Sequence, residues 1–324
     1  MTRRIPLWAT LIPLAVGVAV WAWLWHGYEA GLKADLEQVL PPGTAVESSG
    51  FPYRLEARLA PARLAFDDVA LSATVSAAEA AVNRVPWQRD RQVIAARDSS
   101  ATLMLKPLPG ATVRVDAPMA QASLRLEADR IARLSVVWET PNLSTGLFAA
   151  PVRAGRIEAH LRETPAPAGN PARPGPTGPT QAQLVLNGTA LRFGEGAPLT
   201  LSLESEFTAA GRITSLAGWA TGGTAEIRAA TLSDDTGEVA RLSATLVQDR
   251  DGKLAIAGTI DTVCPASVRA AIAGEAPPAE QRSRKPERIA ISGHLPGNVT
   301  AAARDTTKPP PPVRGQEPPC PRLR

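Results

Sequence analysis

The first 42 residues combine an uncharged apolar run with a helical repeat of apolar positions. No residue in 5–25 is charged, and a helix of that length crosses the roughly 30 Å hydrocarbon core of a bilayer. Apolar residues then recur every three or four positions among charged ones, at Tyr28, Leu32, Leu36, Val39 and Leu40. Pro41, Pro42 and Gly43 end this pattern. It predicts a transmembrane anchor over 5–26 and an amphipathic stem helix over 27–42, whose apolar stripe packs against the remaining chain.

The charges that flank the apolar run indicate its orientation. Arg3 and Arg4 precede it, which makes 1–4 a cytoplasmic stub and sends the chain that follows across the membrane. Tryptophans at both ends match the aromatic belts of the membrane interfaces. A cleaved secretory signal is the alternative, but the run is longer than a usual signal core. In addition, Trp21, Trp23 and Trp25 occupy the place where cleavage would occur.

Beyond Pro42 the apolar positions repeat every second residue. The segment 54–59 alternates charged and apolar residues, and such alternation is typical of a strand with one buried and one solvated face. The same pattern recurs at 69–76, 122–129, 156–162, 182–186, 199–203, 225–229, 242–246, 254–256 and 289–291. Turn sequences such as 234–237 and 249–252 separate neighbouring runs. The predicted class is mainly β, an extended and curled antiparallel sheet that forms an open half-barrel or a sandwich-like arrangement.

The breaks in this pattern indicate the domain organisation. A single β-rich body over 43–299 contains a Pro/Gly-rich loop at 164–180, which can bury almost nothing. A short helix is expected near 267–273, opened by Pro265 and closed by Gly274. The remainder, 300–324, is rich in proline and is expected to be an extended, loosely held tail.

Composition and charge exclude several classes of protein. The chain is 44% hydrophobic, too much for a wholly disordered protein, and its 31 Pro and 25 Gly disfavour an all-helical fold. Its 35 basic and 31 acidic residues are interspersed along the predicted strands. A nucleic-acid-binding protein would gather its basic residues into a stripe, so we expect no nucleic-acid partner.

The sequence offers no constellation of residues for catalysis. His26, His160 and His294 are far apart, and none stands at metal-ligand spacing from another His or a carboxylate. Nucleophile-elbow, phosphate-loop and dinucleotide motifs are also missing from the sequence. We therefore predict no catalytic residue, no metal, no cofactor and no enzymatic activity. The alternative is an envelope hydrolase whose site is not visible in sequence.

The two cysteines, Cys264 and Cys320, permit one intramolecular disulfide. Both follow the anchor and so lie in a compartment that tolerates disulfides. The bridge would attach the proline-rich tail to the body. The alternative is that the two thiols are unpaired or form intermolecular bonds.

A local motif, Gly50-Phe51-Pro52-Tyr53-Arg54, opens the first predicted strand. Gly50 permits a tight turn, Phe51 can contact the stem helix, and Pro52 is tolerated at a strand start. We expect the motif to dock the stem rather than to bind a ligand. The exported anchor, stem, motif and train of strands resemble a bacterial envelope family that is known only as a domain of unknown function. The resemblance implies a single-pass protein of the inner membrane with its body in the periplasm.

Two functions remain open at this point. The first is a binding or scaffold module of the envelope, because two short helices can cover only part of the apolar sheet face. If the sheet curls without closing, the uncovered face is an apolar groove that could hold a lipid, by analogy with AsmA-like lipid-handling proteins. If it closes on itself, the apolar rows are ordinary core. The second function is the hydrolase named above. Protein partners are not indicated.

Overall fold

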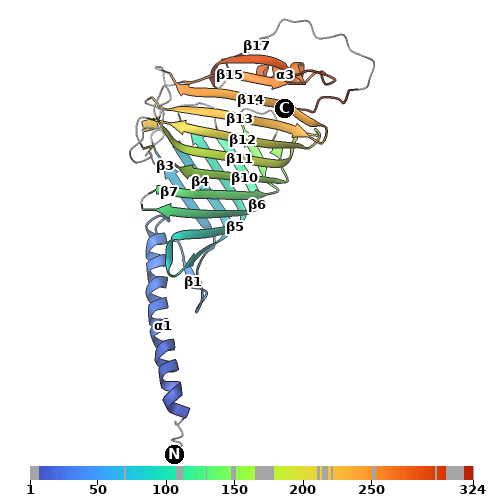
Figure 1. Cartoon of the computed structure of the whole chain (residues 1–324). Helices are drawn as coiled ribbons and strands as arrows, with labels where there is room; N and C mark the ends of the chain where they lie inside the picture. The colour runs from blue at the N-terminus through green and yellow to red at the C-terminus, as the bar shows by residue number, and fades with distance from the viewer. Residues whose placement is uncertain are drawn as a thin grey trace, which may run out of the picture.

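The chain forms one large antiparallel sheet with a long helix at its amino-terminal end, as the computed structural model shows (Figure 1). The structure describes residues 7–68, 71–106, 112–128, 130–146, 151–164, 179–209, 212–213, 218–219, 222–249, 253–295, 298–303 and 317–323. The predicted stub at 1–4 and most of the predicted loop at 164–180 lie outside these residues.

The helices are α1 (Leu7–Glu37) and α3 (Pro265–Ala273). The strands are β1 (Glu47–Ser49), β2 (Leu55–Leu59), β3 (Ala62–Asp67), β4 (Leu71–Val85), β5 (Gln88–Leu105), β6 (Thr112–Glu127), β7 (Arg130–Glu139), β8 (Asn142–Thr145), β9 (Val152–Arg153), β10 (Arg156–Glu163), β11 (Thr180–Phe193), β12 (Leu199–Thr208), β13 (Thr224–Asp234), β14 (Gly237–Gln248), β15 (Leu254–Thr262), β16 (Glu287–Leu295) and β17 (Asn298–Ala303).

The strands form a meander in which most pair with the next strand in the chain. β2 and β3 both pair with β4, and β7 and β8 both pair with β6. From β10 onward each strand pairs with its successor up to β17. In the part of the chain that the structure describes, β17 has ladder partners only on β16, so the sheet is open. The predicted mainly β, antiparallel class is confirmed.

An irregularity crosses the sheet within β5 and β11 and at the junction between β7 and β8. Asp98, Thr140 and Ala190 have positive φ angles of 47°, 45° and 52° although none is glycine. The Thr140 amide donates to the Gly155 carbonyl, and the Gly155 amide donates to the Thr189 carbonyl, so this line continues from strand to strand. On β11 the register shifts at this line. Such bulges bend and twist the strands that carry them.

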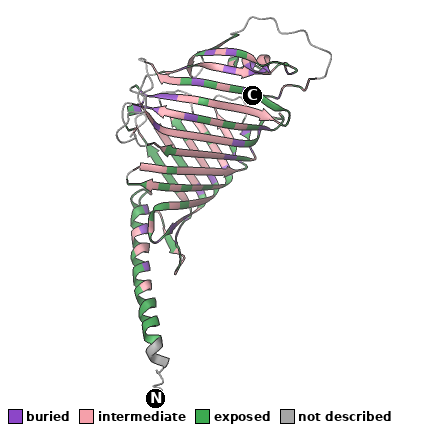
Figure 2. Cartoon of the chain, in the orientation of Figure 1, coloured by how far each residue is buried: buried purple, intermediate pink, exposed green. Residues whose placement is uncertain are grey.

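α1 is one continuous helix that includes residues of both the predicted anchor and the predicted stem. Residues 11–20 are exposed and project away from the sheet (Figure 2). Farther along, Trp25, Leu32 and Leu36 are buried against the apolar side chains of β2. The helix ends at Glu37, before the prolines that were expected to stop it. The predicted apolar stripe of the stem therefore packs on the body.

The carboxyl-terminal part is more ordered than the tail predicted from residue 300. β17 continues to Ala303, and 317–323 returns to the body, where Leu323 is buried. The Cys320 amide donates to the Glu280 carbonyl at 2.8 Å. The expectation of a loose tail is therefore wrong for these two segments, because ladder pairing and burial hold them. α3 begins with Pro265 and is followed by Gly274, which caps the helix with a left-handed φ of 78°.

Candidate functional site

One row of apolar residues crosses almost the whole sheet. Residues that lie directly opposite one another on neighbouring strands share a sheet face. Starting on β2, successive partners are Ala57, Val82, Ile94, Ala122, Val136, Ala159, Leu186, Leu203, Ala230, Leu242, Ile260, Ile289 and Ala303. At about 4.8 Å per strand, the row follows the curved sheet for roughly 55 Å. We call it the apolar row, and the sheet face that carries it the trough face.

The opposite face of the same strands is polar. Apart from Ala81, Ala95 and Val137, the parallel row on that face is polar and consists of Arg58, Gln121, Glu158, Asn187, Ser202, Thr231, Arg241, Asp261 and Arg288. Its charges pair across strands, as Arg288 does with Asp261 at 2.7 Å. This hydrogen bond holds the pKa of the Asp261 carboxyl below its ordinary value. The outer face is thus a solvated surface, and the sheet is strongly two-sided.

Helices cover the two ends of the apolar row and leave its middle uncovered. Ala57 and Val82 are buried in the cluster that contains Trp25 and Leu32 of α1. At the other end, Ile260 and Ile289 are buried in the cluster that contains Val268 of α3.

Between these covers every member of the row is only half-buried; these members are Ile94, Ala122, Val136, Ala159, Leu186, Leu203, Ala230 and Leu242. The pink mid-sheet strands in Figure 2 show the same partial exposure. We call this uncovered middle the trough.

Large apolar side chains are also exposed near the β3 edge. Leu64 of β3 lies opposite Val75 of β4, and their exposed fractions are 43% and 44%. Phe66 and Leu103 are partners of the same residue, Ala73, and both are exposed. β3 has described ladder partners on β4 alone. An apolar patch therefore borders a free edge of the sheet.

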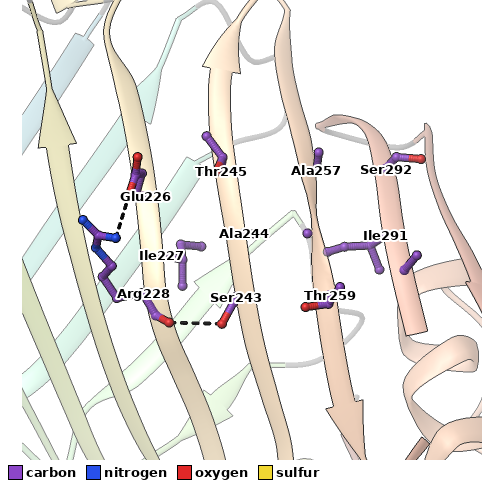
Figure 3. Close-up of a pocket in the computed structure, with 12 residues that line it drawn as sticks. Glu226, Ile227, Arg228, Ser243, Ala244, Thr245, Ala257, Thr259, Ile291 and Ser292 are labelled. Carbon is purple, nitrogen blue, oxygen red and sulfur yellow. Dashed lines mark hydrogen bonds and ion pairs between the residues drawn. The ribbon is translucent and has the colours of Figure 1, made fainter. Parts of the chain in front are cut away.

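A shallow hollow of about 600 Å³ lies on β13 to β16 (Figure 3). Small side chains line much of it, among them Ser243, Thr259 and Ala290, which lie opposite one another on successive strands. Its charged members pair with each other, since Arg228 contacts Glu226 at 3.1 Å. The Ser243 hydroxyl donates to the Arg228 carbonyl at 3.0 Å. The lining contains neither His nor Cys, and its one carboxylate, Glu226, is the partner of Arg228.

An ion pair links neighbouring strands in this region. Arg228 donates to the Glu206 carboxylate at 2.8 Å from the neighbouring strand. This hydrogen bond lowers the pKa of Glu206 and raises that of Arg228. Such a pair favours the charged form of both groups.

The three histidines remain apart in the structure. His26 contacts Glu29 on α1, His160 contacts Ser135, and His294 contacts Asp249. Within the described residues, no group of three or more His, Cys, Asp or Glu side chains could hold a metal ion.

The Gly50–Arg54 motif lies against α1. Gly50 has a φ of 103°, and a Cβ there would stand 2.4 Å from the Arg54 carbonyl oxygen, so only glycine fits this turn. The Phe51 ring stacks edge-on against Trp25 with centroids 5.3 Å apart. The Trp21 indole donates to the Pro52 carbonyl at 2.9 Å, while Tyr53 is 83% exposed.

The two cysteines lie at the α3 end of the trough. Cys264 precedes α3 and is bonded to Cys320 of the carboxyl-terminal segment. Cys264 is fully buried within the same cluster as Val268 and Ile289. This bond joins the segment 317–323 to the helix that covers one end of the apolar row.

The sequence reasoning missed the feature that joins the helix to the sheet by charge. Arg84 of β4 donates two hydrogen bonds to Asp35 of α1. The available signal was that Arg84 follows Ala80 and Val82 on the same face of β4, but its partner is 49 residues away.

These features define a β protein built on a single open sheet, and in the described part of the chain one helix is long and apolar enough to cross a membrane. Over residues 21–315 the chain matches a family described as an uncharacterized protein conserved in bacteria (DUF2125), and it belongs to that family. No curated protein and no solved structure matches it.

Proposed function

We propose that the protein is a single-pass component of the bacterial inner membrane whose periplasmic body binds the acyl chain of a lipid in the trough. The observation that carries the proposal is the apolar row, uncovered between Ile94 and Leu242 and closed by helices at both ends. The proposed role is non-catalytic.

The exposure of α1 supports the anchor. Its residues 11–20 are exposed, and Leu14 is 63% exposed. By length and composition, the helix could cross a membrane. An apolar helix surface that the protein itself does not cover is stable in lipid and unfavourable in water.

The chemistry of the trough favours an acyl chain over a peptide as its occupant. Main-chain groups of the sheet are paired in the strand ladders, and the apolar row offers no side-chain donor or acceptor. A peptide lying there would bury backbone amides without partners, which is costly. A hydrocarbon chain has no such groups, and its burial is favourable at about 25 cal/mol per Å².

Two adjacent valines on β7 allow a matched test. Val136 belongs to the apolar row and lies opposite Ala122, whereas Val137 points to the polar face opposite Glu158. Benzoylphenylalanine would be placed at one or the other position of the full chain. After illumination in cells, the protein would be purified and its intact mass measured by mass spectrometry. We expect a lipid adduct at position 136 and none at 137.

The outcomes separate specific binding from general proximity to the membrane. Equal adducts at both positions, or none at position 136, would contradict binding in the trough. Alkaline phosphatase fused after Arg324 tests the topology separately. We expect the fusion to be active, and an inactive phosphatase with a fluorescent cytoplasmic reporter at the same site would contradict export of the body.

A further inference from the structure

Several aromatic side chains are exposed in the segments where the body meets α1. The exposed fractions of Trp23, Phe51, Tyr53 and Trp87 are 74%, 51%, 83% and 65%. They come from α1, from the loop that precedes β2, and from the turn between β4 and β5. We call these four side chains the aromatic foot. Large exposed aromatic groups that gather on a chain with only 4% aromatic residues indicate a surface that water does not cover in the working protein.

Contacts with α1 fix the height of the foot along the helix. The Trp87 ring lies 6.5 Å from the Trp21 ring, and the Phe51 ring lies 5.3 Å from the Trp25 ring. The Trp21 indole is also hydrogen-bonded to the Pro52 carbonyl. The foot is therefore level with the turn of α1 that holds Trp21 to Trp25.

That level coincides with the end of the uncharged run. At about 1.5 Å per residue, 5–25 is roughly 30 Å long, the thickness of the hydrocarbon core. When α1 spans a bilayer, Trp21 to Trp25 lie at the headgroup layer, where Trp and Tyr are enriched. In Figure 1, β1 and the adjoining turn lie beside α1 at the lower end of the sheet. The body then reaches the same layer through the foot.

We propose that the aromatic foot is immersed in the headgroup and glycerol layer of the bilayer that α1 crosses. The proposal rests on the proposed anchor and goes beyond it, because an anchor alone leaves the body free in water. Phe51 supplies an apolar ring, while Tyr53 and Trp87 each carry a polar hydrogen-bonding group on an apolar ring. This combination suits an interface that is half hydrocarbon and half hydrated.

Spin labels on the full chain in phospholipid nanodiscs test the proposal. Single cysteines would replace Tyr53 and Trp87 in the foot, Leu14 in the exposed part of α1, and Thr236 at the turn between β13 and β14. Unsubstituted protein, labelled in the same way, gives the background of the native cysteines. Collision rates with oxygen, which concentrates in lipid, and with a water-soluble nickel chelate would be measured at each position.

We expect the labels at Tyr53 and Trp87 to collide with the nickel chelate several-fold less often than the label at Thr236, and more often with oxygen. A lipid-like signal at Leu14 with water-like signals at both foot positions would overturn the proposal and leave the anchor intact. Low collision rates with both reagents would indicate a covering protein and also overturn it. A water-like signal at Leu14 would overturn the anchor and the foot together.

Discussion

The guanidinium of Arg84 reaches from β4 to α1 and donates two hydrogen bonds, of 2.8 and 2.9 Å, to the carboxylate of Asp35. Only 5% of the Arg84 side chain is exposed, whereas Asp35 is 57% exposed. Arg84 lies opposite Leu55 in the apolar cluster beneath α1. A buried cation on the sheet is thus neutralised by an acid that the helix supplies.

Replacing Asp35 by Ala should lower the free energy of unfolding by about 1–2 kcal/mol, because it leaves the buried Arg84 without its charged partner. The exposure of Asp35 keeps the effect at the lower end of the range for buried pairs. Chemical unfolding of the full chain in detergent measures it. Glu37→Ala, an exposed acid half a turn away, is the control and should behave like the unsubstituted protein. An unchanged midpoint for Asp35→Ala would show that the contact is not maintained.

Gly258→Ala should destabilise the sheet by about 1–3 kcal/mol, since extra atoms in a packed site force the backbone to shift. A Cβ at Gly258 would stand 2.3 Å from the Ser243 carbonyl oxygen and 2.6 Å from the Ala244 Cβ. Gly27→Ala is the matched control, because nothing lies within 4 Å of a Cβ on that helical residue. Thermal unfolding should separate the two variants. Equal melting temperatures would contradict this close approach of β15 to β14 at Gly258.

Removing the Cys264–Cys320 bond should cost about 4 kcal/mol in the chain-entropy model, because the bond closes a loop with a sequence separation of 56. The double variant Cys264→Ser, Cys320→Ser should unfold at lower denaturant, and the difference should vanish when both proteins are reduced. A thiol count on the denatured, unreduced protein gives the independent check. Two reactive thiols per chain would show that the bridge does not form in cells.

Stability should fall in acid through the outer-face carboxylates. The hydrogen bond from Arg228 lowers the pKa of Glu206 from its ordinary value of 4.5. A carboxyl with a depressed folded-state pKa stabilises the fold fully above its unfolded pKa, and this contribution is lost as the pH falls through the folded value. Unfolding free energies measured between neutral pH and about pH 3 should therefore decline less steeply for Glu206→Gln. A slope for Glu206→Gln equal to that of the unsubstituted protein would contradict the assignment.

Much of the architecture could be predicted from the sequence, because a sheet with one buried face leaves a period of two in each strand separately. Leu55, Ala57 and Leu59 reveal their strand without knowledge of any partner. The openness of the sheet could not be predicted, since it depends on twist accumulated over many strands. The irregularity at Asp98, Thr140 and Ala190 was equally hidden, because ordinary residues there adopt positive φ angles that only the neighbouring strands impose.

The candidate site, like the fold, could be predicted from the sequence only in part. Its composition follows from the alternation, but the apolar row depends on the pairing register, which no single strand specifies. That α1 and α3 cover only the two ends of the apolar row depends on tertiary packing, which no local sequence pattern specifies. The motif Gly50–Arg54 was predicted to dock the stem, and its residues do contact α1; the docking role itself remains a proposal. Trp87 was not singled out, because its significance arises only from its distance to Trp21.

A sheet whose last strand, β17, has described partners on one side only has no ring of hydrogen bonds to set its circumference. In a closed barrel the number of strands and their stagger determine the diameter. In this open sheet the distance between the two edges depends on the twist between neighbouring strands. A small change of twist at each pair of strands adds up over the whole meander. The separation of the two edges of the sheet can therefore vary without breaking any backbone hydrogen bond between the strands.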